Sequence, residues 1–314
     1  MNAGFTYVER IDARGAGRTV VDHLASCYRH SSEAEWRDRI DAGLVLVDGR
    51  PARADDVLRL GQKMDWSRPP WEEPATPMAY AVLREDAALL AVEKPSGLPT
   101  LPGGGYLDHT LLALVRKHYP RAAPMHRLGR GTSGIVLFAL TAPAARIVAK
   151  AWRERRVVKV YRALVEGSPA GDAFTVDARI GRVPHPLLGT VHAAHPDGLP
   201  SLSEVRVVER RGPTSLVEVS IDTGRPHQIR IHMAACGHPL TGDPLYAAGG
   251  GLREGTALPG DTGYFLHAMR LALTHPETGE RFEVECPPPL ELRGSPEQEQ
   301  PQAKEFMEPT RTGR

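Results

Sequence analysis

The Gly-rich run Gly129-Arg130-Gly131-Thr132-Ser133-Gly134 is the first segment of this sequence that suggests chemistry. It matches the G-x-G-x-x-G pattern, in which a strand precedes the glycines and a helix N-terminus after them receives a pyrophosphate. Here His126-Arg127-Leu128 comes before the glycines, and an apolar, strand-like run follows them. Because this order is wrong for the motif, we expect no dinucleotide. The run predicts a flexible loop flanked by Arg127 and Arg130.

The 13 histidines raise the question of a metal site. His227 and His232 are five positions apart, which places them on opposite faces if the segment is a strand. His192 and His195 are close enough to chelate an ion, but no second group of ligands accompanies them in the sequence. We therefore expect satisfied or solvent-exposed histidines and no metal.

Positive charge is concentrated in one part of an otherwise balanced chain. The 39 basic and 38 acidic residues nearly cancel overall, yet the segment 121–159 holds nine basic residues against the single acid Glu154. Such a concentration predicts a basic surface for a polyanion such as a nucleic acid. The alternative is a solvated helix face with counterions. The nine residues are Arg121, Arg127, Arg130, Arg146, Lys150, Arg153, Arg155, Arg156 and Lys159.

Composition indicates an ordinary globular protein that acts in the cytoplasm. With 314 residues, 41% hydrophobic and 25% charged, the chain is neither fibrous nor mostly disordered, and its length favours two domains. Its three cysteines are scattered, which fits a reducing compartment. The first residues form no signal peptide, and the longest apolar stretch, 135–140, is far below the roughly 20 residues that span a bilayer. We expect no membrane partner.

Residues 1–67 are predicted to form a small separate module. A helical apolar pattern covers 20–28, and Ser32 with Glu35 resembles a capping box that opens a second helix through Ile40. The segment 43–49 reads as a strand that enters a tight Asp-Gly turn. This order is similar to the S4 RNA-binding module; the alternative is any small α+β cap.

The Pro-rich segment 68–77 is predicted to be a linker, followed by a main domain over 78–290 and a disordered tail over 291–314. One helix is expected over 143–155, capped by Thr141. Strands do not alternate regularly with helices, so we predict an α+β fold with a mixed, largely antiparallel sheet rather than a doubly wound one. The expected strands are 89–92, 135–139, 157–165, 205–209, 216–221 and 282–286.

Four segments of the main domain together resemble the RluA-type RNA pseudouridine synthase family. Lys94-Pro95-Ser96-Gly97-Leu98-Pro99 is similar to its K-P-x-G-L-P segment, and 126–134 to its H-R-L-D-x-x-T-S-G signature. The run 159–167 is similar to K-x-Y-x-A-L-V-x-G. The fourth segment, 223–230 with 237–246, is similar to T-G-R-x-H-Q-I-R followed by G-H-P-x-x-G-D. A preceding S4-like module is also common in that family.

The resemblance implies an enzyme that isomerises uridine in RNA to pseudouridine without a cofactor. It implies that Arg127 lies near the flipped nucleotide, that Tyr161 stacks on the uracil and assists proton removal, and that Arg230 lines the pocket. Taken alone, Tyr161 could be a core residue of a strand and Arg230 an ordinary ion-pair partner. The residues expected to contact RNA are Lys94, His126, Arg127, Arg130, Thr132, Arg225, His227 and Gln228.

One departure from the family pattern concerns the reaction itself. The family's catalytic aspartate follows H-R-L, and in this chain that position is Gly129. Loss of a central catalytic group commonly costs several orders of magnitude in rate while binding survives. A buried Arg230 without a partner would also be costly, so we expect a carboxylate near it. The candidates are Asp108, Glu154, Asp222 and Asp243.

Two hypotheses follow for the function. In the first, another carboxylate enters the pocket and the protein is an active monomeric synthase on structured RNA, with ribosomal RNA favoured over transfer RNA. In the second, it keeps the fold and the RNA surface but is an inactive RNA-binding or assembly factor. The presence of Tyr161, Arg230 and Lys94 favours the enzyme. The sequence leaves open whether 249–255 is a lid or a long hairpin loop.

Overall fold

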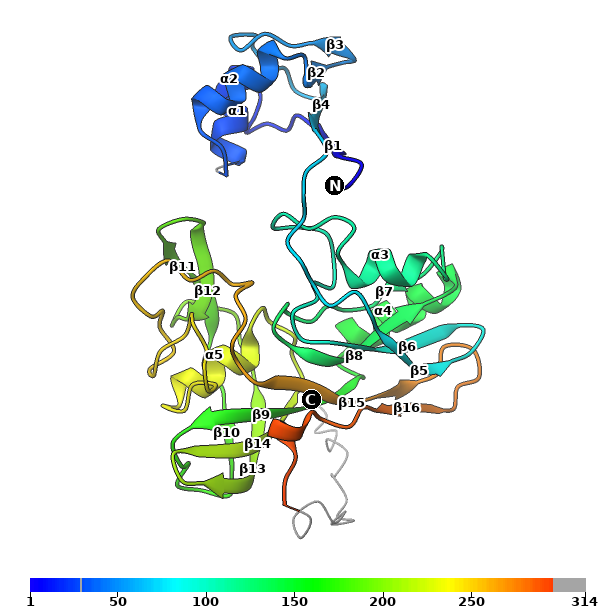
Figure 1. Ribbon diagram of the computed structural model, residues 1–314, viewed down its shortest axis with the longest axis vertical. Helices are drawn as coiled ribbons and strands as arrows, with labels where there is room; N and C mark the ends of the chain where they lie inside the picture. Colours follow the sequence, from blue (N-terminus) through cyan, green and yellow to red (C-terminus); the bar gives the residue numbers. More distant parts are fainter. Residues whose placement is uncertain (29, 296–314) are drawn as a thin grey trace, which may run out of the picture. The chain divides into compact units, whose positions relative to one another are not determined.

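The computed structural model describes residues 1–28 and 30–295, and these fall into two compact units, Met1–Pro74 and Ala75–Arg314. Figure 1 labels their helices and strands. Most of the tail expected from 291 lies outside the described residues. Its first residues are ordered, because Leu290–Leu292 forms a short 3-10 helix, η1, in which Leu292 is buried.

The N-terminal unit (residues 1–74) is a four-stranded sheet packed on two helices, with the sheet order β1-β4-β2-β3. Ser32 and Glu35 form the predicted capping box at the start of the second helix, and Asp48-Gly49 adopt the positive φ angles of a tight hairpin turn. Both local predictions are confirmed. The elements are β1 (Phe5–Arg10), α1 (Val20–Cys27), α2 (Glu33–Asp41), β2 (Val45–Val47), β3 (Arg50–Pro51) and β4 (Lys63–Arg68).

The C-terminal unit (from Ala75 onward) is built on a ten-stranded sheet in the order β10-β13-β14-β9-β15-β8-β6-β5, with β16 and β7 paired to its central strands. Among the described residues, only the β15–β8 pair is parallel. The strands are β5 (Ala81–Glu85), β6 (Leu89–Lys94), β7 (Ala123–Pro124), β8 (Ser133–Ala139), β9 (Val158–Glu166), β10 (Ala173–Val176), β13 (Ser203–Arg211), β14 (Thr214–Ile221), β15 (Leu266–Thr274) and β16 (Arg281–Glu285).

The two faces of this sheet are covered by different helices. The helices α3 (Leu111–Arg116) and α5 (Gln228–Ala235) pack on the face that carries Tyr161, here called the site face. The helix α4 (Ala142–Arg153) packs on the opposite face through Ala144, Val148 and Ala151. A separate hairpin of β11 (Ile180–His185) and β12 (Gly189–Ala194) lies beside α5 (Figure 1).

The predicted fold class is confirmed, because the sheet is mixed and largely antiparallel and the helices do not alternate regularly with the strands. All six predicted strands are present, and the predicted helix is α4, with Thr141 as its side-chain cap. The sequence did not predict β15, the hairpin β11–β12 or the helix α5. The three cysteines are free thiols. None of the helices in the described part of the chain is long and apolar enough to cross a membrane.

Gly134 allows the two parallel strands to meet at the centre of the sheet. It has a φ of 105°, and a Cβ added there would lie 2.2 Å from the Ala268 carbonyl oxygen. The neighbouring Ser133 hydroxyl is 2.9 Å from Nδ1 of His267, whose Nε2 donates to the Cys286 carbonyl at 3.1 Å. The segment Thr132-Ser133-Gly134 therefore joins β8, β15 and the chain after β16.

We expect Gly134→Ala to destabilise the protein by about 2 to 4 kcal/mol, because it adds both a steric clash and an unfavourable φ. Gly212→Ala is the matched control. Gly212 has a φ of 70° but no atom within 4 Å of an added Cβ, so it should cost about 1 kcal/mol. Urea unfolding followed by circular dichroism measures both. Equal effects of the two substitutions would contradict the close approach at Gly134.

Candidate active site

The loop after Leu128 is held by hydrogen bonds from the segment 94–100. The Lys94 ammonium donates to the carbonyls of Pro95, Leu98 and Arg130 at 2.8, 2.7 and 3.3 Å. The Ser96 hydroxyl donates to the Gly131 carbonyl at 2.8 Å, and the Thr100 hydroxyl to that of Leu128 at 2.9 Å. This segment, which we call the clamp, holds the backbone of 128–131 in one shape. The loop expected to be flexible is thus bonded along its length.

Tyr161 lies at the centre of the site face. It pairs with Ala268 of β15, and Ala268 pairs in turn with Gly134 of β8, so the three residues form one row across three strands. Tyr161 is 9% exposed as a residue, and it packs in the same core cluster as Leu128 and Tyr264. Burial raises its pKa to about 12, so the phenol is protonated at neutral pH.

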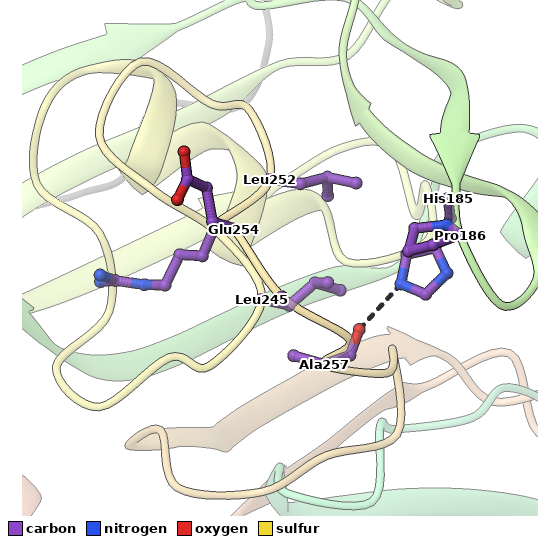
Figure 2. Close-up of a pocket in the computed structure, with 8 residues that line it drawn as sticks. His185, Pro186, Leu245, Leu252, Glu254 and Ala257 are labelled. Carbon is purple, nitrogen blue, oxygen red and sulfur yellow. Dashed lines mark hydrogen bonds between the residues drawn. The ribbon is translucent and has the colours of Figure 1, made fainter.

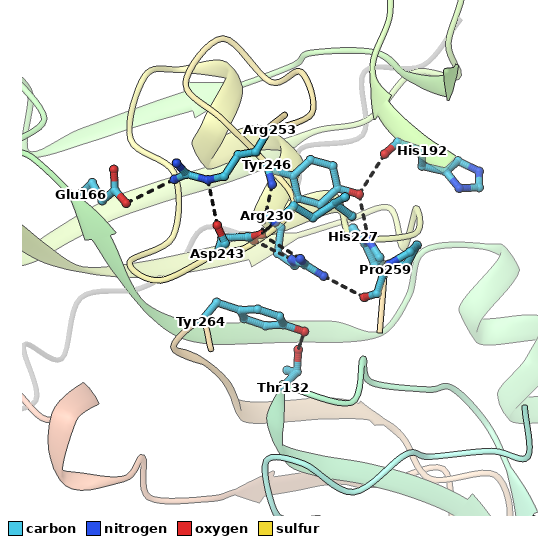
Figure 3. Close-up of polar contacts among 11 residues, drawn as sticks. Thr132, Glu166, His192, His227, Arg230, Asp243, Tyr246, Arg253, Pro259 and Tyr264 are labelled. Carbon is cyan, nitrogen blue, oxygen red and sulfur yellow. Dashed lines mark hydrogen bonds and ion pairs between the residues drawn. The ribbon is translucent and has the colours of Figure 1, made fainter. Parts of the chain in front are cut away.

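Arg230 forms the buried ion pair of the site. Its Nε and one terminal nitrogen donate to the two carboxylate oxygens of Asp243 at 2.7 and 2.8 Å, and its other terminal nitrogen donates to the Pro259 carbonyl at 3.1 Å (Figure 3). The guanidinium carbon lies 4.1 Å from the ring centre of Tyr264 and 5.0 Å from that of Tyr246. Burial alone would lower the pKa of Arg230, but its hydrogen bonds to Asp243 raise it.

Of the four candidate carboxylates, Asp243 is the one that reaches Arg230. Its side chain is fully buried and also accepts the backbone N–H groups of Leu245 and Tyr246, so it is poorly placed to reach a substrate. Glu154 is exposed and pairs with Arg156 and Lys150. Asp222 and Asp108 are exposed as well.

The segment 223–230 is organised by Gln228. Its side-chain oxygen accepts the Thr223 hydroxyl at 2.7 Å and the Arg225 N–H at 3.1 Å, while its nitrogen donates to the Leu202 carbonyl at 2.8 Å. His227 precedes α5 in a left-handed conformation, with Nδ1 2.8 Å from the Tyr246 hydroxyl. Burial, followed by the charge of Arg230, lowers the pKa of His227 to about 3. These contacts position α5 and Arg230.

Charged side chains remain exposed where the loop meets the hairpin β11–β12. Arg127 is exposed, and Arg130 is half-buried with its Nε on the Gly260 carbonyl at 2.8 Å. Burial and then the charges of Arg182 and Arg127 lower the pKa of His192, a half-buried residue of β12. The charges of Arg127 and Arg182 therefore both lie near His192. We call the region formed by these three residues the mouth.

Several residues expected to contact RNA are instead buried or engaged within the protein. Lys94 is wholly buried, and burial together with the Arg130 charge lowers its pKa to about 7. His126 stacks on Trp152 and accepts the Leu137 N–H at 3.0 Å. Thr132 and Gln228 are also buried, and their hydrogen bonds go to protein groups. These four side chains hold the backbone of the site in place, and that they also contact RNA stays a prediction.

The basic cluster of 121–159 does not form one groove. Arg146, Lys150 and Arg153 are exposed on α4, which covers the face opposite Tyr161. Lys159 is buried, and its ammonium donates to the Asp222 carbonyl at 3.2 Å. Of the nine residues, Arg127 and Arg130 flank the site loop.

A cavity of about 270 Å³ is lined by the end of β11, Leu245 and the loop 252–257 (Figure 2). His185 Nε2 donates to the Ala257 carbonyl at 2.9 Å across it.

Gly250 is packed tightly, since an added Cβ would lie 2.7 Å from Ala194, and its carbonyl accepts the Ala194 N–H at 3.1 Å. The start of 249–255 is therefore tied to β12 rather than free as a lid.

Neither a metal nor a dinucleotide is indicated by the geometry. In the part of the chain that the structure describes, no three His, Cys, Asp or Glu side chains converge on a metal position. His232 is satisfied by Ser203 and the Ala178 carbonyl, both at 2.9 Å. The glycines of 129–134 lead into the strand β8 rather than into a helix, so the N–H groups that a pyrophosphate requires are not presented there.

The carboxylate expected near Arg230 is present, and the structure shows which of the four candidates it is, Asp243. Sequence reasoning missed another part of this site. Tyr264 was not considered, yet its hydroxyl lies 3.3 Å from that of Thr132 and its ring is against Arg230. The glycines at 129 and 131 are the signal that could have revealed a bulky neighbour.

Comparison with known proteins decides the family. A family model described as RNA pseudouridylate synthase matches residues 88–235. An uncharacterised RNA pseudouridine synthase of Synechocystis sp. is 39% identical over 87% of this chain and 95% of its own. The chain belongs to the RNA pseudouridine synthase family. The family's name describes isomerisation of uridine in RNA, which is the activity that the four segments implied.

Further relatives of this synthase family support the assignment. RNA pseudouridine synthase 5 of Arabidopsis thaliana is 36% identical over 87% of this chain and 89% of its own. Ribosomal large subunit pseudouridine synthase D of Neisseria meningitidis serogroup B is 34% identical over 89% and 77%. Among solved structures, human RNA pseudouridylate synthase domain containing 1 matches with a TM-score of 0.53 and 28% identity, covering 69% of this chain and 86% of that one.

Asp243→Asn should destabilise the protein by about 3 to 5 kcal/mol, because it leaves the buried Arg230 charge without its partner. Asp172→Asn is the matched control: it breaks the exposed Arg210–Asp172 pair, whose atoms are also 2.7 Å apart, and should cost less than about 1 kcal/mol. Chemical denaturation gives both values. A small effect at Asp243 would show that the pair is not buried in solution.

The pKa of His126 predicts a pH dependence of stability. Burial and the Lys159 charge lower it to about 3, whereas an unfolded histidine titrates near 6.5. As the pH falls below about 6.5, the unfolded chain binds a proton that the native chain does not, so stability falls. His126→Gln keeps an acceptor for the Leu137 N–H, and we expect it to reduce the stability lost between pH 7.5 and 5 by about 1 to 2 kcal/mol.

The control for this experiment is His118→Gln, at an exposed position. It should retain the pH dependence of the native protein. Unfolding free energies at the two pH values are compared for the three proteins, and an unchanged pH dependence in His126→Gln would contradict the prediction.

Proposed function

We propose that this protein is an active pseudouridine synthase that isomerises uridine in structured RNA. The observation that carries the proposal is the arrangement around Tyr161. This buried tyrosine lies in one row with Ala268 and Gly134, next to a loop that the clamp holds rigid and an arginine fixed by Asp243. Such preorganisation suits a reaction in which the target base must be held while it is detached and turned.

The mouth supports RNA as the substrate. Arg127 is exposed beside the site loop, and Arg182 acts on the same His192 from the hairpin. Exposed arginines suit phosphate contacts, and the uridine would have to leave its stack to reach Tyr161. In this proposal Arg127 holds the backbone of the flipped nucleotide, with Arg130, Arg225 and His227 beside it. Tyr161 stacks on the uracil and assists proton removal.

Ribosomal RNA is the favoured substrate, ahead of transfer RNA. The support is the name of the relative from Neisseria meningitidis, a ribosomal large subunit pseudouridine synthase that aligns with 89% of this chain. We propose that the N-terminal unit is an S4-like RNA-binding module, on the basis of its two capped helices and short hairpin. The protein would act as a monomer in the cytoplasm, without a cofactor.

A second candidate function is supported by Gly129. Without a carboxylate at that position the protein could bind RNA and serve as an assembly factor, with no isomerase activity. Of the four alternative carboxylates, the one that reaches Arg230 is saturated with hydrogen bonds and has no exposed surface. The two functions share the RNA surface and differ in the product.

Nucleoside mass spectrometry of unmodified, transcribed ribosomal RNA, before and after incubation with the protein, tests the proposal. We expect the native protein to form pseudouridine. With Tyr161→Phe we expect the rate to fall by about 100-fold or more. Tyr119→Phe is the control, because it removes a hydroxyl that bonds to Glu85 at 2.6 Å outside the site.

RNA affinity is measured for the same proteins at increasing salt. It should fall as salt rises, equally for the native protein and both variants, because phosphate contacts release counterions. Binding without pseudouridine on any bound RNA would overturn the enzyme in favour of the assembly factor. Absent or salt-insensitive binding would overturn both functions.

A further inference from the structure

Gly129 and Gly131 leave space that Tyr264 occupies. A Cβ added at Gly129 would lie 3.0 Å from the Tyr264 hydroxyl oxygen, and one added at Gly131 would lie 2.9 Å from the ring carbon that bears it. Neither glycine has the positive φ that demands glycine, unlike Gly134. The backbone would therefore accept other residues at 129 and 131, and the group that a side chain would meet there is the Tyr264 phenol.

Tyr264 is held in this place from several sides. The chain before it is fixed by Arg230 on the Pro259 carbonyl and by Arg130 on the Gly260 carbonyl. Gly242 also approaches closely, since its Cβ would lie 2.3 Å from the Gly263 carbonyl oxygen. The residue as a whole is 5% exposed. These contacts hold the Tyr264 hydroxyl rigidly beside Gly129, where the loop carries no side chain.

The surroundings of this hydroxyl suit a reacting group. In Figure 3 it points toward Thr132, whose hydroxyl is its neighbour at 3.3 Å, a long contact that leaves it able to bond elsewhere. The guanidinium of Arg230 lies 4.1 Å from the ring centre, where a cation stabilises negative charge that develops on a phenol. The guanidinium is itself fixed by Asp243, so it does not have to move during a reaction.

We propose that the Tyr264 hydroxyl is the oxygen that attacks C1′ of the target uridine, in place of the side chain that Gly129 lacks. The inference rests on the proposed function. Tyrosine is an established nucleophile at an anomeric carbon in some glycosidases. Because the reaction breaks the bond between C1′ and N1, an oxygen held at the sugar splits one difficult step into two easier ones.

The step balances without a further reactant. The bond from the phenolic oxygen to C1′ forms as the C1′–N1 bond breaks, its electron pair goes to the uracil, and the phenolic proton passes to N1. After the base turns, C5 attacks C1′ and the phenolic oxygen leaves with the electron pair of its bond. The proton lost from C5 returns to that oxygen. One proton has moved from C5 to N1, and Tyr264 is regenerated.

The first test compares single-turnover pseudouridine formation by the native protein and Tyr264→Phe. We expect a loss of about 1000-fold or more, with RNA affinity and melting temperature close to native, because the ring and its contact with Arg230 remain. Tyr119→Phe should keep native activity. A Tyr264→Phe rate within about threefold of native would overturn the inference while the proposed function stands. A native protein without activity on RNA that it binds would overturn both.

The second test identifies the attacking residue. Fluorine at C5 withdraws electrons and so slows the attack of C5 on C1′, the step that releases the phenolic oxygen. RNA with 5-fluorouridine at the target position should therefore accumulate the intermediate in which C1′ is bonded to the enzyme. We expect the nucleotide on Tyr264, within the tryptic peptide 254–270, by fragmentation mass spectrometry. A nucleotide attached to another residue, or no attached nucleotide with an active native enzyme, would overturn the assignment.

Discussion

The buried pair of Arg230 and Asp243 is the interaction on which the site depends. It joins the helix α5 to the turn after Gly242, and through the Pro259 carbonyl it reaches the segment that leads to Tyr264. Two charges taken out of water are favourable only when geometry and additional hydrogen bonds are good. Here each nitrogen of the guanidinium and both carboxylate oxygens make a hydrogen bond. An apolar pair of similar volume would hold the helix at lower cost. The ion pair therefore makes sense as a device that fixes position.

Close approach between backbones is the second constraint, and it separates the glycines into two kinds. At Gly134, Gly242 and Gly250 a positive φ and a neighbouring backbone or side chain both require glycine, so these residues serve the fold. At Gly129 and Gly131 the backbone makes no such demand. A side chain there would instead be crowded by a tyrosine from a distant part of the chain. Glycine is thus required by the packing of the fold in the first group, whereas in the second group it leaves room for a side chain of the site.

Local patterns predicted a large part of this fold, and the failures share a cause. The helix α4 and the capping box at Ser32 were found because cap, periodicity and polar face lie close together in sequence. The helix α5 was missed because it is buried on nearly every side and has no polar face. The sequence also did not predict that the basic residues of 121–159 lie on both faces of the sheet, because a run of basic residues does not indicate which face each will occupy. Tyr264 was missed because only the fold brings it to the loop.

The clamp is an argument that this site carries out a reaction rather than only binding RNA. A wholly buried lysine loses its hydration, and stability alone would be served as well by an apolar residue of similar size. Its ammonium joins the carbonyls of Pro95 and Leu98 in the clamp to the Arg130 carbonyl of the loop, between the two glycines that face Tyr264. A surface that needed only to attract RNA would require exposed charge and not a loop of one fixed shape. The cost of burying Lys94 is explained if the position of that loop, to a fraction of an ångström, matters for chemistry.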